Sequence, residues 1–326
     1  MEREGERERG REGERAGEER EGERERGGEG ERERWSGGGK KSSAGFALAL
    51  AVGGGGAWGM KIFARLLLGW WVLVAGCVAP VEQPRPGDKR SAWNGFARVD
   101  FEVAGRSCWV VVPKVAAPGR PWIWRTEFFG HEPQADLELL SRGWHVAYLD
   151  AKNMYGAPKA IALMGQFYTH MTKERRLAKR VVLEGFSRGG LYAFNYAVAH
   201  PQQVAALYLD APVLDIRSWP GKKPQSKEWR DCLAVYGLTE ETVAGFTGGP
   251  LDNVAVVAKA RVPILSVCGG ADKTVPLAEN TALLATRYRE LGGLIEVIVK
   301  DGGDHHPHSL KDPAPIVDFL VKHARF

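Results

Sequence analysis

One short segment constrains this chain more than any other: a serine framed by glycines between a buried-strand pattern and a helix pattern. Residues 185–189 read G-F-S-R-G, and the preceding run at 181–183 is apolar on both faces, as strands of a buried parallel sheet are. Residues 191–197 then read as a helix. A G-x-S-x-G sequence in this context places its serine on a sharp turn with Oγ above the sheet. Ser187 is therefore the predicted nucleophile, and the backbone N–H of Arg188 points to where negative charge develops.

Strand-like and helix-like runs alternate through most of the chain after residue 97. The first two expected strands are close enough for a hairpin, and the later ones are separated by helices, which predicts right-handed crossovers and a parallel sheet. The expected fold class is α/β, a mostly parallel sheet with helices on both faces. The expected strands are 97–103, 107–112, 122–124, 145–149, 181–183, 204–209, 264–268 and 295–299, and the expected helices are 133–142, 158–173, 188–200, 279–291 and 315–323.

Residues 216–261 interrupt this alternation. The segment is long, polar in its first half, and carries Trp219, Trp229 and Tyr236. A connection of this length inside a domain is usually a functional insertion with helices of its own. We interpret it as a helical cap over the strand ends, with Trp219 as a candidate substrate contact. The alternative is a surface excursion with no role in binding.

A serine nucleophile needs a base, and the base needs an orienting acid. In folds with this serine turn the chain order is serine, acid, histidine. Asp272 follows the apolar run 264–267, and His305 follows the run 295–299 after two glycines. We predict Asp272 as the acid and His305 as the base, with His306 as the alternative base. Asp272 could instead be a turn aspartate that caps the next helix.

Three histidines at 305, 306 and 308 also raise the question of a metal. No second ligand group lies near them in sequence, so the prediction is no metal and no cofactor. The three cysteines after residue 77, at 108, 232 and 268, fit no metal-site spacing either. We interpret these as small core residues, with one disulfide as the alternative.

The loop after the third expected strand should supply a second donor to the oxyanion. Its backbone N–H groups at Arg125 or Thr126 are the predicted partners of Arg188, and Glu127 beside them is a candidate substrate contact. The guanidinium of Arg125 or Arg188 could bind an acidic substrate such as a uronic acid, because it offers planar, bidentate donors. Alternatively, either arginine pairs with Glu127 or Glu184.

Residues 1–59 contain an extension unlike the rest of the chain. Its first 34 residues are almost only Glu, Arg and Gly, which leaves no apolar surface to offset the entropy of ordering. We interpret 1–59 as a low-complexity extension, either disordered or translated upstream of the true start, with an interaction segment as the alternative. The basic excess of the whole chain, a formal net charge of +5, is modest and scattered, so no nucleic-acid partner is predicted.

A second candidate start methionine, Met60, opens a segment with the pattern of an export signal. Residues 60–76 begin at Met60 and carry two basic residues, a short apolar run and a small-residue end, which is the layout of a secretory signal. The apolar run is shorter than the roughly 20 residues of a spanning helix. The last residues, V-A-G-C at 74–77, resemble the lipobox of bacterial lipoproteins, which implies a lipidated Cys77. Residues 77–95 then read as a Pro-rich linker to a single domain at 96–326. The alternatives are an uncleaved anchor and a plain signal peptide.

The contexts of Ser187, Asp272 and His305 resemble the α/β-hydrolase superfamily over residues 96–326. More narrowly, W-I-W-R at 122–125, F-G-H-E-P at 129–133 and H-H-P-H-S-L at 305–310 resemble a bacterial group of secreted α/β-hydrolases often found beside sialidases and other polysaccharide-degrading enzymes. That resemblance implies a small-molecule or polysaccharide ester as substrate, no cofactor, and an exported protein, periplasmic or tethered to the outer membrane through Cys77.

Three functions are compatible with the sequence. The first is a carboxylesterase that works through an acyl-enzyme. The second is a serine peptidase like prolyl oligopeptidase, although the chain shows no repeat long enough for the propeller domain of those enzymes. The third is a non-catalytic binding protein on the same scaffold, which an intact set of serine, aspartate and histidine argues against.

Overall fold

The computed structural model describes residues 85–326, and every structural statement below concerns that part of the chain. The predicted extension at 1–59, the signal at 60–76 and the lipidation site at Cys77 lie outside the described residues. Within 85–326, no helix is long and apolar enough to cross a membrane.

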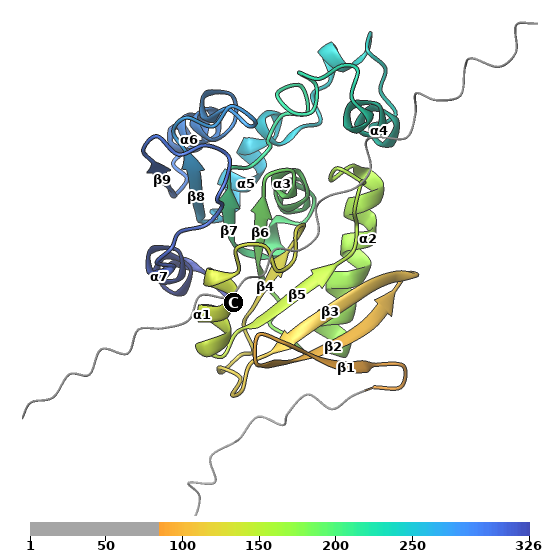
Figure 1. The fold of residues 1–326 in the computed structure, drawn as a ribbon, viewed down its shortest axis with the longest axis vertical. Helices are drawn as coiled ribbons and strands as arrows, with labels where there is room; N and C mark the ends of the chain where they lie inside the picture. The colour runs from red at the N-terminus through yellow and green to blue at the C-terminus, as the bar shows by residue number, and fades with distance from the viewer. Residues whose placement is uncertain (1–84) are drawn as a thin grey trace, which may run out of the picture. The chain divides into compact units, whose positions relative to one another are not determined.

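A mixed sheet forms the centre of the fold (Figure 1). Its strand order among the described residues is β1-β2-β3-β5-β4-β6-β7-β8-β9; the first three strands and β5 pair antiparallel, and all pairs from β5 to β9 are parallel. The strands are β1 (Lys89–Trp93), β2 (Phe96–Val103), β3 (Arg106–Val112), β4 (Trp122–Arg125), β5 (His145–Leu149), β6 (Val181–Phe186), β7 (Val204–Asp210), β8 (Ile264–Gly269) and β9 (Ile295–Lys300).

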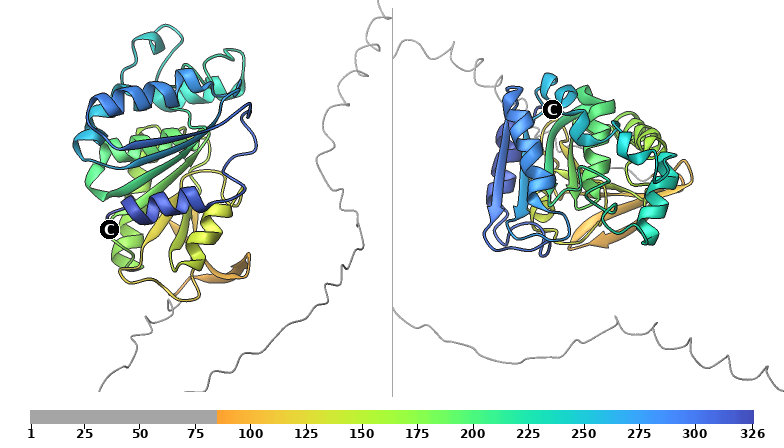
Figure 2. Two further views of the ribbon diagram at one scale, coloured as in Figure 1. Left: turned by 90° about the vertical axis from the view of Figure 1, so that its left-hand side faces the viewer. Right: turned by 90° about the horizontal axis from the view of Figure 1, so that it is seen from above.

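Helices cover both faces of the sheet (Figures 1 and 2), which confirms the predicted fold class. One apolar cluster joins α1 (Gln134–Ser141) and α7 (Ala314–His323) to strand residues such as Ile123 and Val182. The other joins α2 (Pro158–Thr169), α3 (Gly189–Ala199), α5 (Val254–Lys259) and α6 (Thr281–Glu290) to Trp124 and Leu183. Neighbouring residues of one strand thus enter opposite cores, because side chains alternate between the faces of a sheet.

The first strand lies where the sequence predicted only a linker. β1 pairs with β2 through a turn at Asn94 and Gly95, both at positive φ. Asn-Gly between two strands is a strong hairpin signal, which the sequence analysis did not use. Four of the five β1 residues are exposed, so the strand has no alternating apolar pattern that would reveal it. The helix expected at 158–173 also divides, into α2 and a π-helical turn at His170–Glu174.

Residues 216–261 connect β7 to β8 and contain α4 (Lys227–Tyr236), two short 3-10 turns (Val243–Gly245 and Pro250–Asp252) and α5. The first half builds a small apolar cluster of its own around Trp229 and Cys232. That cluster includes Leu191 of α3 and Val275 of the β8–α6 loop, so this part packs over the carboxyl ends of the central strands. α5 packs against α3 and α6 and therefore belongs to the main helical layer.

The cysteines at 108, 232 and 268 are buried free thiols, so the alternative of a disulfide between any two of them is wrong. Burial raises the pKa of the Cys108 and Cys232 thiols to about 12. They act as small core side chains, as the sequence predicted.

His145 at the start of β5 makes the stability of the fold sensitive to acid. Its ring is fully buried, its Nδ1 lies 3.4 Å from the carbonyl oxygen of Pro121, and its Nε2 has no hydrogen-bond partner. Burial, with a smaller effect of Arg120, lowers the pKa of His145 from 6.5 to about 3. Between those values the unfolded chain binds a proton that the folded chain does not, so the free energy of unfolding falls as the pH falls from about 6.5 towards 3.

We therefore expect His145→Leu to flatten the acid limb of the stability curve. The slope of unfolding free energy against pH, measured by urea titration between pH 4 and 6, should fall by about 1.4 kcal/mol per pH unit, the effect of one proton. His323→Leu, at a partly exposed position in α7, serves as the matched control. Equal slopes in wild type and His145→Leu would contradict the assignment.

Candidate active site

The turn between β6 and α3 holds Ser187 in a strained conformation. Its φ is +49°, in the left-handed region that non-glycine residues rarely adopt. Its N–H donates to the carbonyl oxygen of Asp210 at 2.9 Å, and its carbonyl oxygen accepts from Val213 N–H at 2.8 Å. Two glycines make room for the turn: a Cβ on Gly185 would lie 2.8 Å from a backbone oxygen of α3, and one on Gly190 would lie 2.6 Å from Pro212 Cβ.

Ser187, His305 and Asp272 form a continuous hydrogen-bonded row. The Nε2 atom of His305 lies 3.0 Å from Ser187 Oγ, and its Nδ1 lies 2.7 Å from Asp272 Oδ2. The other carboxylate oxygen of Asp272 accepts the N–H groups of Thr274 and Val275, both at 2.8 Å. Asp272 is thus also the turn aspartate of the alternative interpretation, because one oxygen orders the turn and the other faces the histidine.

The structure places His305, and not His306, in this row. His306 is exposed, and its ring meets the ring of His305 edge to face at a centroid distance of 4.9 Å. A base must reach the nucleophile through one ring nitrogen and its orienting acid through the other. His305 is the residue that satisfies both requirements.

Backbone hydrogen bonds tie the loop that carries Asp272 to the loop that carries His305. The N–H of Ala271 donates to the Gly303 carbonyl at 2.8 Å. One carboxylate oxygen of Asp304 accepts the N–H of His305 at 2.8 Å and that of Lys273 at 3.2 Å, and these bonds lower the pKa of Asp304. The spacing of acid and base is therefore fixed by one backbone hydrogen bond between the loops and by the carboxylate of Asp304.

The predicted oxyanion donors need one correction. The N–H of Thr126 donates to the Glu184 carbonyl at 2.9 Å, so it is not available to a substrate oxygen. Glu127, one residue further, has an N–H without a hydrogen-bond acceptor among the described residues, and a Cβ on Gly189 would lie 3.7 Å from that nitrogen. The N–H of Arg188 likewise has no acceptor within 85–326. The backbone N–H groups left free at this turn are therefore those of Arg188 and Glu127, which makes them the candidate oxyanion donors.

Arg125 is not an oxyanion donor or a substrate contact either. It lies inside the sheet in β4, and its fully buried guanidinium contacts Asp136 of α1 and lies 3.6 Å from Glu184 of β6. The same guanidinium donates to the carbonyl oxygen of His131. Burial alone would lower the pKa of Arg125, but Glu184 and Asp136 outweigh it and raise that pKa. Of the two roles predicted for the Arg125 guanidinium, substrate binding or an ion pair, the structure shows the ion pair.

Arg188 and Glu127 form a second, more accessible pair beside Ser187. Their side chains approach to 3.2 Å, and Arg188 also donates to Asn153 at 3.3 Å. Burial raises the pKa of Glu127, against the opposing effect of Arg188. The Arg188 guanidinium lies 5.5 Å from the ring centre of Tyr155, which stacks at 6.3 Å on Trp219. Glu127, Arg188 and Trp219 are thus linked through Tyr155 in one row of contacts that begins at the residue after the nucleophile.

Asp210 is a site residue that the sequence analysis missed. It is fully buried at the end of β7, and its carboxylate lies 2.7 Å from Nδ1 of His308 and accepts the N–H of Ser309 at 2.8 Å. The aspartate that ends the apolar run 204–209 was the available signal, because a carboxylate there is buried and needs partners.

Comparison with known proteins matches part of this chain to a known sequence family. The model of the prolyl oligopeptidase family matches residues 166–325, which contain Ser187, Asp272 and His305. No curated protein sequence gives a significant match.

Many solved structures share the fold. They include acylaminoacyl peptidase of Pyrococcus horikoshii (12% identity, TM-score 0.51, 73% of this chain and 42% of that one) and dipeptidyl peptidase 4 of Porphyromonas gingivalis (17%, 0.55, 72% and 35%). The esterase rPPE, in a doubly substituted form, aligns at 16% identity and TM-score 0.53 over 77% of this chain and 88% of its own. The chain thus spans less than half the length of these two peptidases. At these identities the likeness shows the α/β-hydrolase fold.

We expect removal of the buried Arg125 side chain to destabilise the fold far more than removal of an exposed arginine. Arg125→Met leaves Asp136 and Glu184 buried without their cation, which should lower the free energy of unfolding by about 3–5 kcal/mol. The control is Arg142→Met, whose exposed pair with Glu138 at 2.8 Å should contribute less than about 1 kcal/mol. Urea unfolding of both variants decides the matter, and similar losses in the two would contradict a special role for Arg125.

Proposed function

We propose that this serine hydrolase of the α/β-hydrolase fold, whose residues 166–325 match the prolyl oligopeptidase family, is a carboxylesterase that works through an acyl-enzyme. The observation that carries the proposal is the row from Ser187 Oγ through the His305 ring to Asp272, with distances of 3.0 and 2.7 Å. This arrangement activates a hydroxyl for attack on a carbonyl carbon.

In the first half of the reaction, Ser187 Oγ attacks the ester carbonyl as its proton passes to Nε2 of His305. The carbonyl oxygen becomes an oxyanion, for which the N–H groups of Arg188 and Glu127 are the donors. Asp272 stabilises the imidazolium through Nδ1. The bond to the alkoxide then breaks, and His305 returns the proton to the leaving alcohol. In the second half, water repeats these steps on the acyl-enzyme and frees Ser187.

Esters and peptides require the same triad, so the choice between them rests on other observations. The esterase that shares the fold aligns over 88% of its own chain, so the described residues correspond to nearly the whole of such an enzyme. The α4 segment packs on Leu191 of α3, and Arg188 pairs with Glu127, so both features lie close in the fold to the turn that carries the nucleophile. The family match supports the alternative, a serine peptidase.

We expect Ser187→Ala to lower kcat/KM for an alkyl ester by about 10⁴-fold or more, because triad members act as a unit. Ser141→Ala, at an exposed serine that ends α1, should leave the rate unchanged. Labelling by a fluorophosphonate should likewise disappear only in Ser187→Ala. Turnover within about tenfold of wild type in Ser187→Ala would contradict the proposal.

A matched ester and amide of one acyl group separates esterase from peptidase. The proposal expects hydrolysis of the ester without measurable cleavage of the amide or of peptides. Cleavage of the amide within about a hundredfold of the ester rate would favour the peptidase alternative. For the substrate itself, we propose an acyl ester on a polysaccharide, and a screen of acetylated and feruloylated polysaccharides tests it.

We further propose that the mature protein is exported and tethered through a lipid on Cys77, as V-A-G-C at 74–77 suggests. Expression of the full chain in a bacterial host, followed by mass spectrometry of the mature N-terminus, should find diacylglycerol on Cys77. Cys77→Ala, which keeps the preceding residues, should abolish the modification. A mature chain that begins before Cys77, or that still carries Met60, would refute this assignment.

A further inference from the structure

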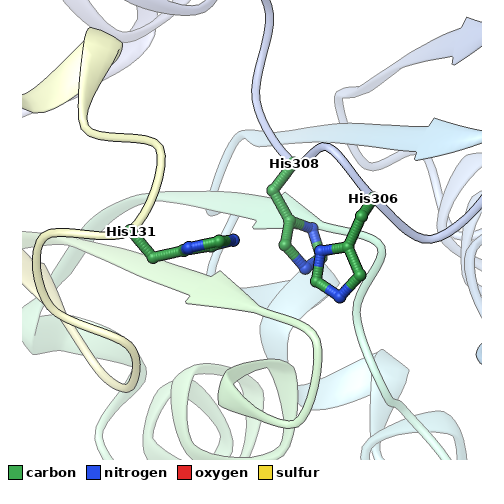
Figure 3. A group of neighbouring side chains, drawn as sticks. All are labelled: His131, His306 and His308. Carbon is green, nitrogen blue, oxygen red and sulfur yellow. The ribbon is translucent and has the colours of Figure 1, made fainter. Parts of the chain in front are cut away.

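Three histidines outside the catalytic row converge at one point beside it. His131 lies in the loop between β4 and α1, and His306 and His308 lie in the loop after β9 (Figure 3). One ring nitrogen from each lies within 4.8 Å of the other two. The sequence argued against a metal because no second ligand group lies near 305–308. The fold supplies that group as His131, from a distant part of the chain.

The arrangement of the rings is close to that of a tetrahedral metal site. Zinc–imidazole bonds of about 2.0–2.1 Å place ligand nitrogens about 3.3 Å apart and ring centres about 5 Å apart. The ring centre of His306 lies 4.8 Å from that of His308, and His131 lies 5.8 Å from each. The planes cross at 79–90°, so the rings meet edge to face and do not stack. The ligand nitrogens lie within 4.8 Å of one another, so binding of a metal ion would draw them together by up to about 1.5 Å.

A buried carboxylate orients one of the ligands. Nδ1 of His308 lies 2.7 Å from Oδ1 of Asp210, and both residues are buried. Metal-binding histidines typically donate one ring N–H to a carboxylate, which leaves the lone pair of the other nitrogen for the metal. In His308 that other nitrogen is Nε2, and the ring faces His131 and His306 (Figure 3).

The loop that carries His131 is also held in place by a buried side chain. The carbonyl oxygen of His131 accepts a hydrogen bond from the buried guanidinium of Arg125. His305, by contrast, uses both ring nitrogens, one on Ser187 and one on Asp272, so it is not available as a ligand. The cluster therefore consists of three histidines on two braced loops, separate from the catalytic row.

We propose that His131, His306 and His308 bind one divalent transition-metal ion, of which Zn²⁺ is the best match. Three imidazoles suit zinc and its neighbours in the first transition row, and the fourth coordination position would hold water. The ion would join the loop that carries His305 to the loop that carries Glu127 and so restrain both sides of the catalytic row. This site is independent of the substrate and does not rest on the proposed esterase activity.

The test is zinc binding by the full chain after removal of metal with a chelator. Isothermal titration with Zn²⁺ should give one ion per chain, and the melting temperature should rise with the zinc concentration, as it does when a ligand binds only the folded state. His131→Gln and His306→Gln, both at exposed positions, should each raise the dissociation constant at least about tenfold and remove the thermal shift. His323→Gln and His200→Gln, which lie outside the cluster, should change neither.

Two results would overturn the proposal. One is a wild-type chain, folded by circular dichroism, that binds no Zn²⁺ at about 100 μM, which is far weaker than three histidines bind zinc. The other is equal affinity in wild type and in the double variant His131→Gln/His306→Gln, which would place the ion elsewhere. Neither readout uses hydrolysis, so failure of the metal site and failure of the esterase proposal are distinguishable.

Discussion

The buried aspartate at the end of β7 is the point on which the rest of the site depends. The carbonyl oxygen of Asp210 accepts the N–H of Ser187, and its carboxylate holds His308 and the N–H of Ser309. One residue therefore fixes both the strained turn of the nucleophile and the loop that carries the base. A buried carboxyl group is costly unless its hydrogen-bond partners are in place, and the loop after β9 supplies those partners to β7.

A second buried network secures the other side of the nucleophile. Arg125 joins β4 and β6 to α1 through Glu184 and Asp136 and also holds the carbonyl oxygen of His131. Buried ion pairs contribute little net stability, but the loss of one partner is severe. The network therefore specifies position more than it adds stability. Its consequence is that the loop after β4 presents the N–H of Glu127 beside α3.

In this site, the residues that would carry out the chemistry differ from those that would contact the substrate. The triad and the two free N–H groups account for the proposed cleavage of an acyl bond, whereas the α4 segment and the Arg188–Glu127 pair lie outside that machinery and are the candidate substrate contacts. The three histidines add a further element, because an ion there would join the two loops that Asp210 and Arg125 already hold. Catalytic loops placed by several independent constraints can keep the sub-ångström precision that acyl transfer requires.

The sequence by itself determined the elements and much of the site. Apolar, β-rich runs predicted every strand from β2 to β9, since burial in a sheet leaves a residue composition that is a local property. It also singled out Ser187, Asp272 and His305 through the residues around them and their chain order, although not their distances. Local reasoning missed β1, whose residues are mostly exposed, because an edge strand is defined by its partner.

Tertiary structure alone decided which groups share a partner. The N–H of Thr126 is used within the sheet while that of Glu127 is not, a difference of one residue that depends on where β4 ends against β6. Asp210 meets His308, and His131 meets His306, only because parallel strands bring their carboxyl ends to one edge of the sheet. Those contacts join residues that are far apart in the chain. A local sequence pattern cannot predict the distance between such residues, because that distance depends on the assembled sheet.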